Sequence, residues 1–157
     1  MSSPSPSPAS PSPVSRSLPL IRELVRCYQA FEVVSAAHIR TLGLTPPQFD
    51  IIATLGNTEG MRFKALGEKT LCTKGTLTGI VDRLADKGLV QRIACPHDGR
   101  SQIVRLTPAG EALFATAFPA QLAHMDAALA GLDTARMVSL QQGLHDLRGI
   151  LENRAAS

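Results

Sequence analysis

The sequence contains no apolar run long enough to cross a membrane. A membrane-spanning helix needs roughly 18 consecutive apolar residues, and Pro119, Gln121 and His124 interrupt the richest stretch. The N-terminus also lacks a basic segment followed by an apolar run, which a secretory signal would require. We therefore expect a cytoplasmic protein with no membrane partner.

Cysteine is scarce as well. The chain has three cysteines, Cys27, Cys72 and Cys95, an odd number with no repeated short spacing. This usage predicts reduced thiols rather than a disulfide framework. The four histidines show no spacing typical of metal ligands, and the nearest approach, Cys95-Pro96-His97, is crowded by its proline. We expect neither a metal site nor a cofactor.

Sequence motifs of common enzymes are also missing. The chain has no Gly-rich phosphate loop, no nucleophile elbow and no metalloprotease motif. Asp50 and Glu59 do not form an obvious acid–base pair. These absences argue against an enzyme and favour a binding protein.

The positive charge is concentrated in the middle of the chain. All 157 residues together carry a net charge of +3, with 44% hydrophobic and 18% charged residues, as in a soluble globular protein. Residues 62–105 hold nine basic and four acidic side chains, a net charge of +5, whereas the remainder holds seven and nine, a net charge of −2. A surface that faces nucleic-acid phosphates requires such a distribution.

The composition divides the chain into three parts. Residues 1–17 are almost only Ser, Pro and Ala, and such an arm is predicted to be disordered because it cannot bury enough apolar area. Residues 18–152 have the length and patterning of a single domain, and residues 153–157 form a tail. Within the domain we expect dimerisation helices at 18–43 and 108–152, on either side of a winged helix-turn-helix at 45–107.

The periodicity predicts a mostly helical fold with a small β-hairpin, in the order α-α-α-α-β-β-α-α. A first helix ends at Gly43, and a capping box at Thr45 and Gln48 starts the second. A short helix, Phe63–Lys69, precedes one capped by Thr73, and together they read as a helix-turn-helix. Strands are predicted at Leu89–Ala94 and Gln102–Leu106, with the turn residues between them. The apolar stripe of the helix after Thr73 consists of Leu77, Ile80, Val81 and Leu84.

The last helix, capped by Asp133, carries an apolar seam at alternating steps of three and four residues. Two helices share a seam of this kind, so it predicts a homodimer. Its members are Met137, Leu140, Leu144, Leu147 and Leu151.

The basic middle has the features of a DNA-binding surface. A helix fits the major groove, with its N-terminal residues at the base edges, and an Arg on a hairpin tip suits a narrow minor groove. Asp98 is placed to orient Arg100 through a charge-assisted hydrogen bond. The candidate DNA-binding residues are Lys64, Thr73, Lys74, Gly75, Thr76, Thr78, Arg83, Arg92, Asp98 and Arg100.

Five segments of this region resemble the MarR family of bacterial transcriptional regulators. They are Leu66–Lys69 (LGEK), Lys74–Leu84 (KGTLTGIVDRL), Lys87–Val90 (KGLV), Asp98–Ser101 (DGRS) and Leu106–Gly110 (LTPAG). The most specific marks are the Asp-x-Arg in the hairpin and the Leu-Thr-x-x-Gly that follows it. The similarity extends over about residues 20–152.

The resemblance implies a triangular dimer, formed by the first helix and the last two. It implies that the helix after Thr73 reads the major groove of a pseudo-palindromic operator in double-stranded DNA, and that Arg100 enters the minor groove. Many members respond to small phenolic or aromatic-acid ligands, and most repress transcription. A repressor released by such an effector is therefore the expected function.

The sequence leaves three alternatives. A ligand wall is predicted at Tyr28, Phe31 and Phe49, with His38 and Arg40 as anchors for an anionic group, but plain dimer core is an equal reading of these residues. The alternative is a regulator that senses oxidants through the thiol of Cys27 or Cys72. The competing interpretation is that both thiols only pack as small apolar side chains. A winged helix that binds protein instead of DNA is a further alternative, and loss of binding in high salt would distinguish the two.

Overall fold

The computed structural model describes residues 15–70, 74–96 and 98–156, without the side chains of residue 74 and residues 98–100. Its contacts divide the chain into two units, Met1–Val33 and Val34–Ser157, and each is described by itself. The predicted disordered arm falls almost wholly outside the described residues, as do Cys72 and Thr73. The helices and strands are α1 (Leu18–Thr41), α2 (Pro46–Leu55), β1 (Met61–Arg62), α3 (Phe63–Lys69), α4 (Lys74–Asp86), β2 (Val90–Cys95), β3 (Asp98–Leu106), α5 (Pro108–Ala128) and α6 (Thr134–Ala155).

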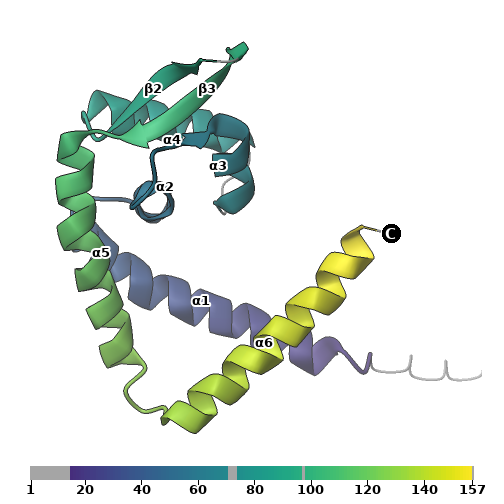
Figure 1. The fold of residues 1–157 in the computed structure, drawn as a ribbon. Coiled ribbons are helices and arrows are strands. Elements are labelled where there is room, and N and C mark those ends of the chain that lie inside the picture. Colours follow the sequence, from purple (N-terminus) through teal and green to yellow (C-terminus); the bar gives the residue numbers. More distant parts are fainter. Residues whose placement is uncertain (1–14, 71–73, 97, 157) are drawn as a thin grey trace, which may run out of the picture. The chain divides into compact units, whose positions relative to one another are not determined.

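The core of the second unit lies where α2, α3 and α4 meet the sheet (Figure 1). The predicted stripe on α4 is confirmed, since all four of its side chains are buried. Because these positions recur at one helical face, the opposite face of α4 stays exposed. The largest fully buried side chains are Ile51, Ile52, Leu55, Leu66, Leu77, Val81, Leu84 and Val104.

Glycine ends two of the helices, as the sequence predicts. Gly43 has a φ of +75°, a conformation that L side chains rarely adopt. The amide of Gly43 donates to Arg40 O at 3.1 Å and that of Leu44 to Ile39 O at 3.4 Å, the two bonds of a Schellman motif. Gly88, with a φ of +69°, ends α4 in the same way.

Side chains start three helices at the predicted positions. The Oε1 of Gln48 accepts a hydrogen bond from the Thr45 amide at 3.1 Å, which is one half of the capping box. Thr107 Oγ1 accepts from the Gly110 amide at 3.1 Å at the start of α5, and Asp133 Oδ1 accepts from the Arg136 amide at 2.8 Å at the start of α6. Each bond satisfies an amide that the helix itself leaves unpaired.

The sheet differs from the predicted hairpin in two respects. It has three antiparallel strands in the order β1-β3-β2, because the two residues of β1 pair with Val104 and Ile103 of β3. A strand of two residues shows no periodicity, so the sequence could not reveal it. The predicted start of the second strand, Gln102, is also wrong: β3 begins at Asp98, which pairs with Cys95 past an irregularity in register. Asp98 and Gly99 indicated a turn there, but Asp98 pairs with Cys95 of β2 and so begins the strand despite its low strand propensity.

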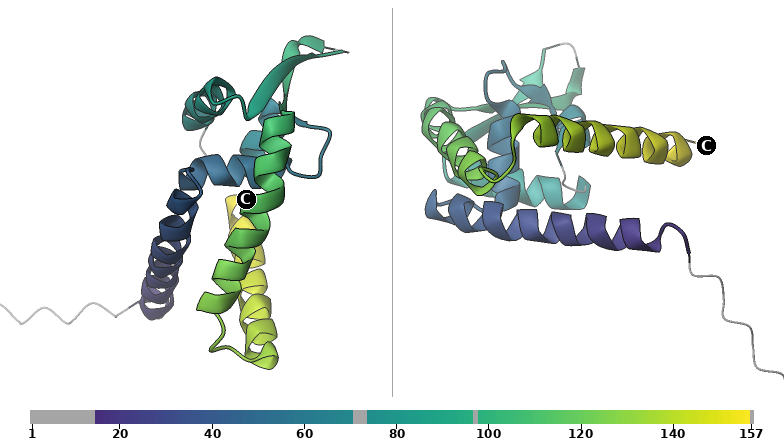
Figure 2. Two further views of the ribbon diagram at one scale, coloured as in Figure 1. Left: turned by 90° about the vertical axis from the view of Figure 1, so that its left-hand side faces the viewer. Right: turned by 90° about the horizontal axis from the view of Figure 1, so that it is seen from below.

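The two C-terminal helices differ in how much they bury. On α5, Phe114 and Ala117 are buried, and Phe118 packs between Phe114 and Phe49, with ring centroids 5.1 Å and 6.5 Å apart. By contrast, α6 buries none of its residues. Figure 2 shows α6 leaving the end of α5 after a short connection. The described part of the chain has no helix long and apolar enough to cross a membrane.

Candidate DNA interface

The exposed face of α4 is the first element of the candidate interface. Gly75, Thr76 and Thr78 are exposed and lie within its first two turns. A Cβ added at Gly75 would meet nothing within 4 Å, so no packing of the protein against itself requires glycine there. The open backbone leaves room for a close approach by another molecule.

Basic side chains flank this face. Lys64, in α3, is highly exposed, and its Nζ lies 4.0 Å from Glu68 Oε1 in a weak surface pair. Arg83 is exposed in the last turn of α4. Lys74 starts α4, but its side chain lies outside the described residues, as do the side chains of Asp98 and Arg100 in β3. Thr73 is outside them altogether. The predicted roles of these four residues stay predictions.

Arg92, another predicted DNA-binding residue, contacts three residues of the two preceding helices. Its Nη2 forms an ion pair with Asp82 Oδ1 at 2.7 Å and donates to the carbonyl oxygen of Thr78 at 3.3 Å. Its guanidinium also lies over the ring of Phe63, 5.3 Å from the centroid. The sequence analysis did not identify Asp82 and Phe63 as partners of Arg92. The two-residue spacing of Val90 and Arg92 could have indicated that Arg92 lies on the same face of β2 as the apolar Val90.

The predicted ligand residues fall into both units. In the first unit, Tyr28 Oη donates to Glu32 Oε1 at 2.9 Å. The hydrogen bond to Glu32, the charge of that carboxylate and slight desolvation raise the pKa of Tyr28 above its ordinary value of 10.0. Phe31 is half exposed. Cys27, predicted to pack in a core, is exposed on α1, and its Sγ lies 3.9 Å from Glu23 Oε1.

In the second unit, a polar cluster joins the end of α1 to α5. His38 Nδ1 lies 2.7 Å from Oε1 of the buried Gln121, whose Nε2 donates to Ser35 Oγ at 3.0 Å. Because that amide oxygen can only accept, the contact is a hydrogen bond in the form of His38 that carries a proton on Nδ1. The ring of His38 stacks on that of His124, with centroids 4.5 Å apart, and His124 Nε2 lies 3.2 Å from Val34 O. Neither Gln121 nor His124 was singled out as a ligand residue from sequence.

Two further predicted ligand residues lie in the same unit. Phe49 is partly buried and stacks on Phe118, one turn from Gln121 along α5. Arg40 is exposed at the end of α1. The second unit thus places an aromatic surface and a polar cluster on adjacent turns of α5.

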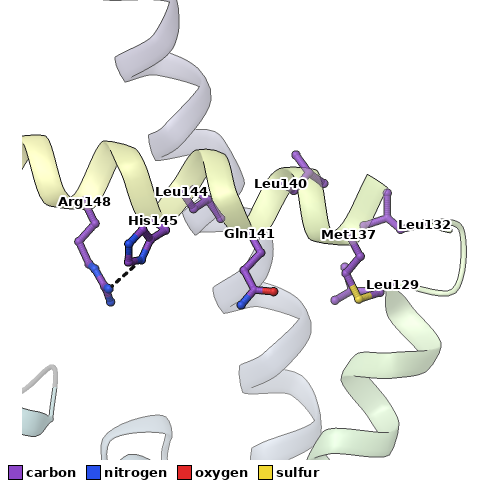
Figure 3. A pocket seen from close by; sticks show the side chains of 8 residues that line it. All are labelled: Leu129, Leu132, Met137, Leu140, Gln141, Leu144, His145 and Arg148. Carbon is purple, nitrogen blue, oxygen red and sulfur yellow. Dashed lines mark hydrogen bonds between the residues drawn. The ribbon is translucent and has the colours of Figure 1, made fainter. Parts of the chain in front are cut away.

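A groove of about 540 Å³ lies at the junction of α5 and α6 (Figure 3). Its floor is apolar, and Arg148 Nη2 lies 3.3 Å from His145 Nδ1 at the end away from Leu129 and Leu132. The groove includes three members of the predicted seam, all of which are half exposed. The lining residues are Leu129, Leu132, Met137, Leu140, Gln141, Leu144, His145 and Arg148.

Comparisons with known proteins agree with this geometry. Residues 44–102, which include α2, α3, α4 and most of the sheet, match the model of the MarR family. The chain is 32% identical over 111 residues to the HTH-type transcriptional regulator MhqR of Bacillus subtilis, a match that covers 71% of this chain and 77% of that protein.

Two solved structures are similar over more than four fifths of the chain. A probable transcriptional regulator from Pseudomonas aeruginosa is 34% identical, with a TM-score of 0.69, over 81% of this chain and 96% of that one. BpsR of Bordetella bronchiseptica, whose DNA binding is regulated by 6-hydroxynicotinic acid, is 25% identical, with a TM-score of 0.77, over 87% of this chain and 98% of that one. These relatives are transcriptional regulators rather than enzymes, and the chain belongs to the MarR family of DNA-binding transcriptional regulators.

Proposed function

We propose that the protein is a sequence-specific repressor that binds a pseudo-palindromic operator as a homodimer and is released by a hydroxylated aromatic acid. The observation that carries the first part is the two-sided character of α4. Four apolar side chains anchor one face in the core, while Gly75 and the hydroxyl-bearing Thr76 and Thr78 are exposed on the other. A helix held in this way is suited to the major groove.

The positive charge supplies the affinity. Lys64 and Arg83 are exposed on the two helices of the helix-turn-helix, and their exposure supports a proposed role in phosphate contact. Phosphate contacts release counterions, so log affinity falls linearly with log salt, with a slope of about −0.9 per contact. The DNA upstream of the protein's own gene is the natural first probe.

The test measures binding to that DNA from low to moderate salt for the wild type and for Arg83→Gln. We expect a steep slope for the wild type, reduced in the variant by roughly 1 per protomer. A flat salt dependence would contradict the proposal and favour a winged helix that binds protein.

The second copy is proposed to cover the apolar seam of α6. Leu140, Leu144 and Leu151 are 53%, 58% and 54% exposed, and a soluble protein seldom leaves a contiguous apolar stripe of this kind uncovered. The repeat of three and four residues matches a shared helical seam. A two-fold dimer would set two copies of α4 about one DNA turn apart, roughly 10 base pairs.

The effector is proposed to bind near the polar cluster of α1 and α5. The DNA binding of BpsR is regulated by a hydroxylated aromatic carboxylate, and here Gln121, which contacts His38, lies one turn along α5 from Phe118, whose ring stacks on Phe49. A ligand weakens DNA binding only through its different affinity for the two conformations. A coupling of about 1–3 kcal/mol is usual, a 5- to 150-fold change in operator affinity.

Titration of 6-hydroxynicotinic acid against the protein–operator complex tests this part. We expect release at micromolar to millimolar concentration, weakened by Gln121→Leu and unchanged by Gln142→Leu on α6. If no aromatic acid acts, while an oxidant acts through Cys27 or Cys72, the thiol-sensing alternative replaces it. A cytoplasmic location is part of the same proposal, since the operator lies on the chromosome.

A further inference from the structure

Arg92 leaves β2 on the side of the sheet that faces the core. Side chains two residues apart share one face of a strand, and Val90, two residues earlier, is 2% exposed. The residue paired with Arg92 across the sheet is Val104, which is fully buried. A charged side chain on this face can reach solvent only by passing the helices. The residues around it therefore determine which groups its charge contacts.

The neighbours of Arg92 belong to the two helices of the helix-turn-helix. Asp82 and Thr78 lie one turn apart on α4, and Nη2 bonds both the Asp82 carboxylate, at 2.7 Å, and the Thr78 carbonyl, at 3.3 Å. The flat face of the guanidinium lies over Phe63, the first residue of α3. One side chain of the wing therefore contacts both α3 and α4.

The guanidinium is also partly withdrawn from water. The side chain of Arg92 is 26% exposed, and its Nε is buried with no hydrogen-bond acceptor among the described residues. A DNA phosphate would have to compete with Asp82, which already lies within 2.7 Å. Arg92 is thus poorly placed to contact phosphate.

We propose that Arg92 is a positioning residue, which fixes the orientation of α4 against the wing and so determines how well the helix reads its operator. The inference rests on the proposed role of α4 in DNA binding. A guanidinium can donate two bonds from one nitrogen while its planar face lies over a ring, whereas a lysine ammonium has no planar face to stack. Readout of bases requires side chains to be held within about 0.5 Å of their binding positions. A loosely held α4 would therefore lose specificity for its operator before it loses general affinity for DNA.

Two substitutions give opposite results under positioning and under phosphate contact. Arg92→Lys keeps the charge but loses the planar group that lies over Phe63, so we expect operator affinity to fall about tenfold, whereas a phosphate contact would survive with little change. Asp82→Asn removes a negative charge from the DNA-facing helix. Charge alone predicts equal or tighter binding to DNA, but loss of the pair predicts operator binding about threefold to tenfold weaker.

Arg83 on the same helix provides the matched control, because it is exposed. Loss of a phosphate contact, as expected in Arg83→Gln, weakens operator and unrelated DNA alike and lowers the salt slope. For Arg92→Lys we expect an unchanged slope, nearly unchanged binding to unrelated DNA and a reduced ratio of operator to unrelated affinity. Wild-type operator affinity in both Arg92→Lys and Asp82→Asn would overturn the inference, as would losses in both that affect the two DNAs equally.

Hydrogen exchange in the absence of DNA separates this inference from the proposed function. If Arg92 holds α4, the α4 amides of Arg92→Lys and Asp82→Asn should exchange several-fold faster than in the wild type, while those of α5 keep their rates. If the wild type binds no DNA but α4 responds in this way, the proposed function fails and the positioning contact stands. Unchanged α4 exchange in both variants overturns the inference whatever the DNA data show.

Discussion

Replacement of Gly110 by alanine should destabilise the protein, although the residue lies in a helix where alanine is normally the better choice. Gly110 is the third residue of α5 and is buried. An added Cβ would overlap the carbonyl oxygen of Leu89 and lie 3.3 Å from the Cβ of Leu106. The same carbonyl oxygen accepts a hydrogen bond from the Thr107 amide at 3.1 Å, and Thr107 Oγ1 donates to Gly88 O at 2.6 Å. The start of α5 is thereby held against the end of α4 and the base of the wing.

The magnitude follows from three opposing effects. Alanine in place of glycine stabilises a helix interior by about 1 kcal/mol. Overpacking against a backbone atom costs about 1–3 kcal/mol, and displacement of the Leu89 carbonyl leaves the Thr107 amide without its partner at a cost of about 1–3 kcal/mol. The net expectation is a loss of about 3 kcal/mol in the free energy of unfolding, which for a chain of this size lowers the melting temperature by about 6–12 °C.

The assay is thermal unfolding followed by circular dichroism, at one protein concentration. Gly79→Ala provides the control, because a Cβ at Gly79, in the middle of α4, would meet nothing within 4 Å. The same chemical change should raise the melting temperature there by about 2–4 °C, through helix propensity alone. A Gly110→Ala protein that melts at or above the wild-type temperature would refute the close-approach argument.

Two further predictions concern the first and last helices. Tyr28 is the only tyrosine, so the ultraviolet signal of phenolate reports it alone; Glu32→Gln should lower its pKa toward 10.0 by removing the hydrogen-bonded carboxylate. Because the folded pKa of Tyr28 is raised, any stability that the pair contributes is fully present below pH 10.0 and is lost as the pH rises through the folded pKa. An unchanged titration in Glu32→Gln would show that Glu32 does not raise the pKa of Tyr28. Leu144→Glu, in the α6 seam, should shift the protein from dimer to monomer at micromolar concentration in sedimentation experiments, while Ser139→Glu, off the seam, should leave the mass unchanged; a dimeric Leu144→Glu protein would exclude the seam as the interface.

The sequence by itself determined the helices and their ends. Capping side chains such as Thr107 and Asp133, and the glycines after α1 and α4, act within a few residues along the chain, so their effect is visible without any tertiary contact. The stripe on α4 was equally predictable, because burial of one helix face needs only a period of 3.6. Periodicity also predicted the element order, charge placement predicted DNA binding, and the family motifs supported both expectations.

Only the tertiary structure determined which strands pair and which partners the polar side chains contact. Nothing in the local sequence reveals that β1 pairs with β3, since two residues carry no period, or that β3 starts at Asp98. His38 meets Gln121 across 83 positions of sequence, and a contact of that kind depends on how α1 and α5 pack rather than on either helix alone. Arg92 is the clearest example: the sequence made it a candidate for DNA contact, and only the fold shows that it is paired with Asp82 on α4. Sequence determines which residues are charged, whereas packing determines which partner that charge meets.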